Sequence, residues 1–367
     1  MIFKDIFSGI DSLYVSYKGK LKEGIVEILE EKKTIAQSGD EKFQSLATFP
    51  IEDHIFEVLD KGARNYSYVL VDNWYRIQIS KGKRVPPLYV QISSELLNCY
   101  GVEYSLYKLR EIISHLITTE KETISRSDIF VDFITNYNLE EISKSSWITT
   151  GNTSTAKYWE GNKFTGWTIG MKGDISVRLY NKSIELQRKP REYLKEIWET
   201  NGWDRESQVW RLEFELKRGF LKHVETHTYS DLQTHINDLW RYCTGSWLRM
   251  SIPEPTINRS RWATLPLWEK IQEMRFLNGT HTGITRYVDK SRLPSEKTML
   301  LNGMGYFTSF MAREGYEEMT EEVLKKFYER ANSILEKATK HSDHYQGVKD
   351  YVMTKVKSKK RRYNKKI

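Results

Sequence analysis

The order of apolar and polar residues predicts strands and helices in two successive rounds. In the first round, residues 8–17 alternate with the period of two that is typical of a strand, and residues 20–37 place leucine and isoleucine at helical spacing. Short strands are predicted between residues 54 and 94, and residues 103–118 carry a stripe of apolar side chains that predicts an amphipathic helix.

The second round repeats this order. Its predicted segments are a strand at 125–135, two strands around a Lys-Gly turn at 164–182, mixed helix at 183–200, a strand at 209–218 and a helix at 229–244. Two rounds of this kind predict an α+β fold of antiparallel sheets with helices on one side, built from two related halves at about 1–120 and 121–250.

A change of pattern follows the second round. Residues 251–262 contain two prolines, which break regular structure, so we place a domain boundary there. Beyond it the pattern is mostly helical, most clearly at 318–340. We therefore predict a main domain over 1–250, a smaller helical region over 251–354 and a basic tail over 355–367.

The charge of the chain is concentrated in that tail. Lys and Arg number 57 against 49 Asp and Glu, a net charge of +8. Residues 355–367 hold eight of these bases and no acid, so the rest of the chain carries equal numbers of both. Such a tail is typically disordered alone and favours nucleic acid as a partner, although a purely solubilising tail has the same composition.

Composition also narrows the class of protein. Aromatic residues make up 13% of the chain, which is enough for a packed core. No apolar run is long enough for a membrane helix, and the first residues do not read as a signal peptide. The two cysteines cannot supply a thiolate metal site. We expect a cytoplasmic globular protein without a membrane partner.

Three of the predicted strands have one apolar face and one charged face. Side chains alternate along a strand, so residues two apart share a face. Antiparallel sheets often keep one face in water, which is the ordinary explanation for any single strand of this kind. The residues on the charged faces are Arg126, Asp128 and Asp132; Asp174, Ser176, Arg178, Tyr180 and Lys182; and Arg211, Glu213, Glu215 and Lys217.

If these strands are neighbours, carboxylates lie beside basic residues and a tyrosine. Oxygen ligands suit Mg²⁺ or Mn²⁺. A metal beside Tyr180 would offset phosphate charge and favour the phenolate, since a phenol with a pKa near ~10 is a poor nucleophile. Arg178 and Lys182 flank this tyrosine and could bind phosphate oxygens.

Six short motifs occur in the order found in a known family. They are Gly9-Ile10-Asp11, Arg126 to Phe133, Gly166 to Gly170, Arg178 to Lys182, Val209 to Glu215 and Asn258 to Trp262. Over residues 8–270 the chain resembles the rolling-circle replication initiators of staphylococcal plasmids and the related relaxases of Gram-positive integrative conjugative elements. The His-x-His metal pair of other relaxases is absent, because no two of the eight histidines are two residues apart.

The resemblance implies a metal-dependent DNA strand transferase that acts at an origin of replication or transfer. Tyr180 would attack one phosphodiester, hold the 5′ end as a phosphotyrosine and leave a 3′-OH for rolling-circle replication or transfer. A host DNA helicase and a homodimer are also implied. The implied Mg²⁺ or Mn²⁺ ligands are Asp128, Asp132, Glu213 and Glu215. The residues assigned to phosphate binding and charge stabilisation are Arg126, Arg178, Lys182 and Arg211.

Asp11 is a weaker candidate for the metal. In a regular strand it lies on the same face as Leu13, away from the other candidates.

A non-enzymatic alternative is a single-stranded nucleic-acid-binding protein with sheets like those of an RNA-recognition motif. Tyr180 would then stack on a base, and Arg178 and Lys182 would contact phosphates. The acidic face disfavours this alternative, because four carboxylates without a metal would repel a nucleic-acid backbone. Metal dependence separates the two hypotheses, since only the strand transferase should lose activity in a chelator.

Overall fold

The structure is a computed structural model, and it describes residues 2–151, 154–255, 258–276, 296–340, 342 and 345–362. The chain divides into two compact units. Unit 1 contains residues 1–22 and 74–286, and unit 2 contains residues 23–73 and 287–367. The domain boundaries predicted from the sequence stay predictions.

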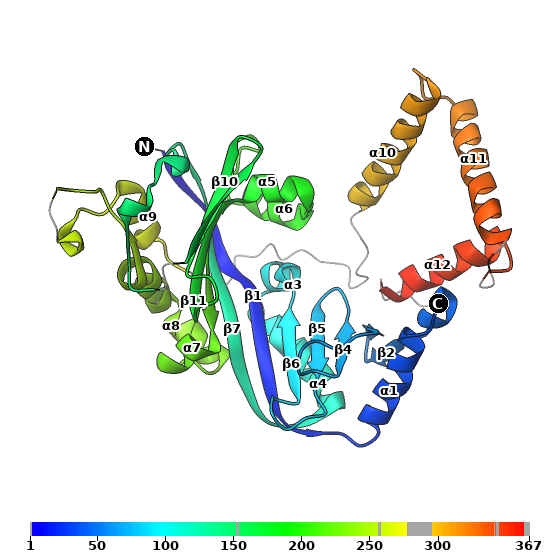
Figure 1. The fold of residues 1–367 in the computed structure, drawn as a ribbon, viewed down its shortest axis with the longest axis horizontal. Helices are drawn as coiled ribbons and strands as arrows, with labels where there is room; N and C mark the ends of the chain where they lie inside the picture. The colour runs from blue at the N-terminus through cyan, green and yellow to red at the C-terminus, as the bar shows by residue number, and fades with distance from the viewer. Residues whose placement is uncertain are drawn as a thin grey trace. The chain divides into compact units, whose positions relative to one another are not determined.

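An antiparallel sheet forms the centre of unit 1. Its strands are β1 (Phe3–Leu21), β5 (Tyr75–Ile79), β6 (Leu88–Ile92), β7 (Ile117–Thr135), β9 (Thr155–Glu160), β10 (Lys163–Ile169), β11 (Ile175–Asn181) and β12 (Val209–Lys217). They lie in the order β5-β6-β1-β7-β12-β11-β10-β9. Figure 1 shows the long strands β1, in blue, and β7, in teal, side by side.

Helices and one small strand pair complete unit 1. The helices are α3 (Ser94–Tyr100), α4 (Val102–Leu116), α5 (Lys182–Arg188), α6 (Glu192–Thr200), α7 (Arg218–His223), α8 (Tyr229–Arg241), the π-helix η3 (Tyr242–Trp247) and α9 (Pro266–Glu273). Short 3-10 turns lie at η1 (Leu139–Glu141), η2 (Lys144–Ser146) and η4 (Arg259–Arg261). The strand pair is β8 (Trp147–Thr149) with β13 (Leu248–Met250).

Helices pack on both faces of the unit 1 sheet. On the apolar face, the ring of Phe214 in β12 lies 5.5 Å from the ring of Trp240 in α8. On the charged face, Trp198 of α6 donates a hydrogen bond to Asp132 of β7. The predicted antiparallel α+β class is confirmed, but helices contact both faces rather than one. The charged face can be covered because its carboxylates are paired with arginines, which lowers the cost of burying them.

Unit 2 combines a small antiparallel sheet with helices. Its strands lie in the order β2 (Thr48–Ile51), β3 (His54–Val58), β4 (Tyr68–Val71). Its helices are α1 (Ile25–Ala36), α2 (Glu41–Gln44), α10 (Glu296–Glu314), α11 (Glu321–Lys340) and α12 (Val348–Arg362). Phe307 and Met311 of α10 pack on Val323 of α11. The predicted C-terminal helical region is confirmed.

Element boundaries differ from the predictions where polar residues interrupt a pattern. Strand β7 begins at Ile117, within the helix predicted over 103–118. The first half of this strand is polar and shows no apolar alternation, so the sequence pattern did not reveal it. The tail also differs, since α12 continues to Arg362; residues 363–367 lie outside the described part. Within the described residues, no helix is both long and apolar enough to cross a membrane.

Candidate active site

The site residues predicted from the sequence meet on one face of three adjacent strands. Strand β12 lies between β7 and β11, as the hypothesis of neighbouring strands required. Lys182 follows β11 directly and begins α5. The register places Asp128 opposite Glu215, Asp132 opposite Arg211, Arg178 opposite Glu213 and Tyr180 opposite Arg211.

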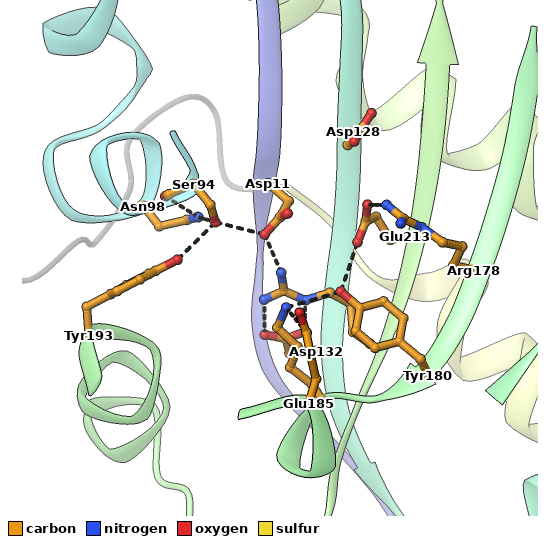
Figure 2. Close-up of polar contacts among 12 residues, drawn as sticks. Asp11, Ser94, Asn98, Asp128, Asp132, Arg178, Tyr180, Glu185, Tyr193 and Glu213 are labelled. Carbon is orange, nitrogen blue, oxygen red and sulfur yellow. Dashed lines mark hydrogen bonds and ion pairs between the residues drawn. The ribbon is translucent and has the colours of Figure 1, made fainter. Parts of the chain in front are cut away.

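The hydroxyl of Tyr180 lies between a carboxylate and an ammonium group. It donates a hydrogen bond to Oε2 of Glu213 at 3.0 Å, and it accepts one from Nζ of Lys182 at 3.2 Å. Burial and the Glu213 charge raise the pKa of Tyr180 well above its usual value, so the resting residue is a neutral phenol. Figure 2 shows this hydroxyl pointing at Glu213.

Lys182 is held by the start of helix α5. The side chain of Asn181 caps this helix by accepting a hydrogen bond from the backbone N–H of Ile184. The Lys182 side chain is buried and forms an ion pair with Glu185 at 2.5 Å. Burial and the nearby Arg211 lower the pKa of Lys182. Its ammonium therefore gives up a proton more readily than an exposed lysine does.

Arg211 is the buried centre of an ion-pair network. Its Nε and one terminal nitrogen donate to the two oxygens of Asp132 at 2.6 and 2.7 Å. Another terminal nitrogen pairs with Asp11, and the guanidinium lies 3.6 Å from the ring centroid of Phe130. Arg211 is 0% exposed. In this arrangement Arg211 links β12 to β7 and β1, and the phosphate contact predicted for it stays a prediction.

Asp11 joins this network because β1 is irregular. It is the extra residue of a bulge between Ile10 and Ser12, which face consecutive residues of β7. Its carboxylate accepts a hydrogen bond from Ser94 of α3 at 2.8 Å. Burial would raise the pKa of Asp11, but the charges of Arg211 and Lys182 and the hydrogen bond from Ser94 together outweigh it, and the pKa falls to about 2. The placement of Asp11 on the opposite face, expected for a regular strand, was wrong.

Two other arginines bind carboxylates but keep contact with solvent. Arg178 pairs with Glu213 while its side chain is 46% exposed. Arg126 binds both oxygens of Asp128, at 2.7 and 2.5 Å, and pairs with Glu215 at 2.7 Å. Of the predicted phosphate-binding residues, Arg178 therefore has the guanidinium that an incoming phosphate can reach most directly.

The predicted metal ligands do not form a ready metal centre. No group of three His, Cys, Asp or Glu within the described ranges is arranged to hold an ion. Arginine occupies both oxygens of Asp128 and of Asp132, where a metal would bind. Burial, Glu213 and Glu215 raise the pKa of Asp128 to about 7, so carboxylate repulsion at this site is only partly relieved by arginine.

Several residues of the site escaped the sequence analysis. Tyr193 of α6 donates to the hydroxyl of Ser94, which in turn contacts Asp11 (Figure 2). Trp198 of the same helix binds Asp132 at 2.9 Å. These contacts join residues far apart in the chain, and no local pattern marks them.

Comparisons with known proteins give limited similarity. No family model and no curated protein matches the chain. Among solved structures, the chain is similar to a rolling circle replication initiator protein from Geobacillus stearothermophilus. That match has 15% sequence identity and a TM-score of 0.43, and it covers 76% of this chain and 99% of that chain. A similarity at this level leaves the function to be inferred from the geometry of the site.

Proposed function

We propose that the protein is a DNA strand transferase that nicks and rejoins one strand at an origin, with Tyr180 as the nucleophile. The observation that carries this proposal is the position of the Tyr180 hydroxyl, which contacts the carboxylate of Glu213 and the ammonium of Lys182. A tyrosine with a base and a cation at its oxygen has what a phenol needs to attack phosphorus.

The contacts suggest a role for each neighbour. Glu213 accepts the Tyr180 proton as the phenol oxygen bonds to phosphorus, and Lys182 stabilises the developing negative charge. The bond from phosphorus to the 3′ oxygen breaks, and that oxygen takes up a proton from solvent. Arg178 exchanges Glu213 for a phosphate oxygen, which its solvent exposure allows. The products are a 5′-phosphotyrosine and a free 3′-OH.

The biological setting follows from this product. A free 3′-OH primes rolling-circle replication or accompanies conjugative transfer, and the reverse reaction rejoins the strand. We propose an origin of replication or transfer as the partner DNA, with a host helicase and a second copy of the chain as further partners. We also propose the cytoplasm as the compartment in which it acts.

Metal dependence stays a prediction. The candidate ligands Asp128, Asp132, Glu213 and Glu215 are held by arginine or by Tyr180, so no step is assigned to a metal. A requirement for Mg²⁺ or Mn²⁺ would mean that DNA binding first separates these pairs.

A non-enzymatic single-stranded nucleic-acid binder is the second candidate. The pairing of acids with arginines favours it more than the sequence did, because a neutralised face does not repel a phosphate backbone. The two candidates differ in covalent chemistry, which only the strand transferase performs.

The deciding experiment is an adduct assay. Single-stranded and supercoiled DNA from the element that encodes the protein is incubated with Mn²⁺ or chelator and run on a denaturing gel. Wild type is expected to give a covalent band that Tyr180→Phe lacks, and Tyr193→Phe, a nearby tyrosine that does not contact Glu213, should retain it. Binding without any adduct would establish the second candidate instead.

A further inference from the structure

Two tyrosines flank a glycine on the charged face of the sheet. Gly166 of β10 lies opposite Tyr158 of β9 on one side and opposite Tyr180 of β11 on the other. Strands in a sheet are about 4.8 Å apart, so the strands that carry the tyrosines are separated by about 10 Å. Tyr158 is 45% exposed and belongs to the strand at the edge of the sheet.

Gly166 puts no side chain between the two tyrosines, and the close approach of β11 restricts this position to glycine. A Cβ atom at this position would lie 2.1 Å from the carbonyl oxygen of Leu179 and 2.8 Å from Cα of Tyr180, and the φ angle of +149° also favours glycine. In the next row, Thr168 lies between Ala156 and Arg178. The face between β9 and β11 therefore carries small residues between an exposed aromatic ring and an exposed guanidinium.

This arrangement fits a nucleotide of single-stranded DNA. A base can stack on an aromatic ring whatever its sequence, and Arg178 supplies the positive charge that a phosphate needs. A polypeptide segment could pack on the ring of Tyr158, but it has no phosphate to pair with Arg178 beside Tyr180.

We infer that Tyr158 is the stacking platform for a base next to the phosphodiester that Tyr180 attacks. The inference rests on the proposed function, because it takes Tyr180 as the point where the phosphate lies. Tyr158 is then a positioning residue that holds the DNA strand across β10 and aligns its phosphate with the Tyr180 hydroxyl.

The test measures binding without cleavage. All variants carry Tyr180→Phe, and the probe is an oligothymidylate of about 12 nucleotides, within the site sizes of single-strand binders, with one internal 2-aminopurine. Tyr158→Ala should weaken binding about 5- to 150-fold, the equivalent of the ~1–3 kcal/mol that base stacking contributes. It should also remove the quenching that stacking causes in 2-aminopurine. Tyr158→Phe, which keeps the ring, should retain both.

Tyr242→Ala is the matched control. Tyr242 is 40% exposed, but it belongs to η3, whose Trp247 packs on Phe214 of the apolar face. Equal affinity and equal quenching in Tyr158→Ala and Tyr242→Ala would overturn the inference. Failure of the proposed function has a different signature: no adduct with wild type, while Tyr158→Ala still loses affinity.

Discussion

Glu213 serves two partners, and this makes its role testable. One oxygen pairs with the exposed Arg178 and the other accepts the proton of Tyr180. Because a positioned general base contributes about 10²–10⁴-fold, Glu213→Gln should slow adduct formation by at least ~100-fold in single-turnover kinetics. Glu215 lies two residues from Glu213 on the same face and does not contact Tyr180. The Glu215→Gln variant should therefore form the adduct at a rate within a few fold of wild type. A similar large loss in both variants would favour the predicted metal ligation over the base.

Asp128 should make stability depend on pH. Its pKa is raised to about 7 by burial and by neighbouring carboxylates, from an ordinary value of 3.8. A raised carboxyl pKa means that the folded state holds the proton more tightly, so its stabilising effect is present at low pH and is lost as the pH rises toward 7. Asp128→Asn removes this loss. Urea unfolding should show that, from pH 5 to pH 8, the free energy of unfolding of the variant rises relative to that of wild type by an amount on the order of 2–3 kcal/mol.

Comparing the stability difference between variant and wild type at two pH values removes the effects of the substitution that do not depend on pH. Asn at position 128 alters the hydrogen bonds from Arg126 equally at pH 5 and pH 8. A stability difference between variant and wild type that is the same at both pH values would contradict the raised pKa of Asp128.

At the scale of single elements, strand alternation predicted the charged faces of β7, β11 and β12, and their residues do meet. Alternation alone could not show that β12 lies between the other two, because that depends on pairing between distant segments. It failed for Asp11, since this residue is itself the extra residue of a bulge and its side chain does not follow the alternation of the strand. The ion pairs between arginines and carboxylates could not be predicted either, because the sequence shows which residues are charged but not which of them pair.

Gly166 shows how one strand residue controls the position of Tyr180. A methyl group there would collide with the backbone of Leu179, so Gly166→Ala should destabilise the fold by about 1–3 kcal/mol and displace the tyrosine. Adduct formation should fall with it. Gly161→Ala, in the turn of the same hairpin, also has a positive φ of +57° but has no atom within 4 Å of the added carbon. It should cost about 1 kcal/mol and leave the adduct rate unchanged.

At the scale of the whole molecule, the chain is divided in a way that local patterns do not reveal. Unit 2 joins residues 23–73 to residues 287–367, and nothing in either segment marks the other as its partner. The sequence predicted the helices and strands whose apolar residues follow a clear period, such as α4, β11 and α11. It also treated the basic tail as a separate segment, whereas Lys355 lies in α12 and lines a cavity of about 450 Å³ within unit 2.

The helical character of the tail sharpens the test of its role in binding DNA. Deleting residues 355–367 would remove part of α12, so replacing the seven Lys and Arg beyond Lys355 with Gln, a good helix former, is cleaner. If these charges contact phosphates, affinity should fall similarly on all DNA sequences, and the log–log salt slope should drop by at most ~6, at about 0.9 per phosphate. An unchanged slope in filter binding across a salt series would remove the tail from the DNA interface, while a loss confined to origin DNA would mean that it reads sequence rather than charge.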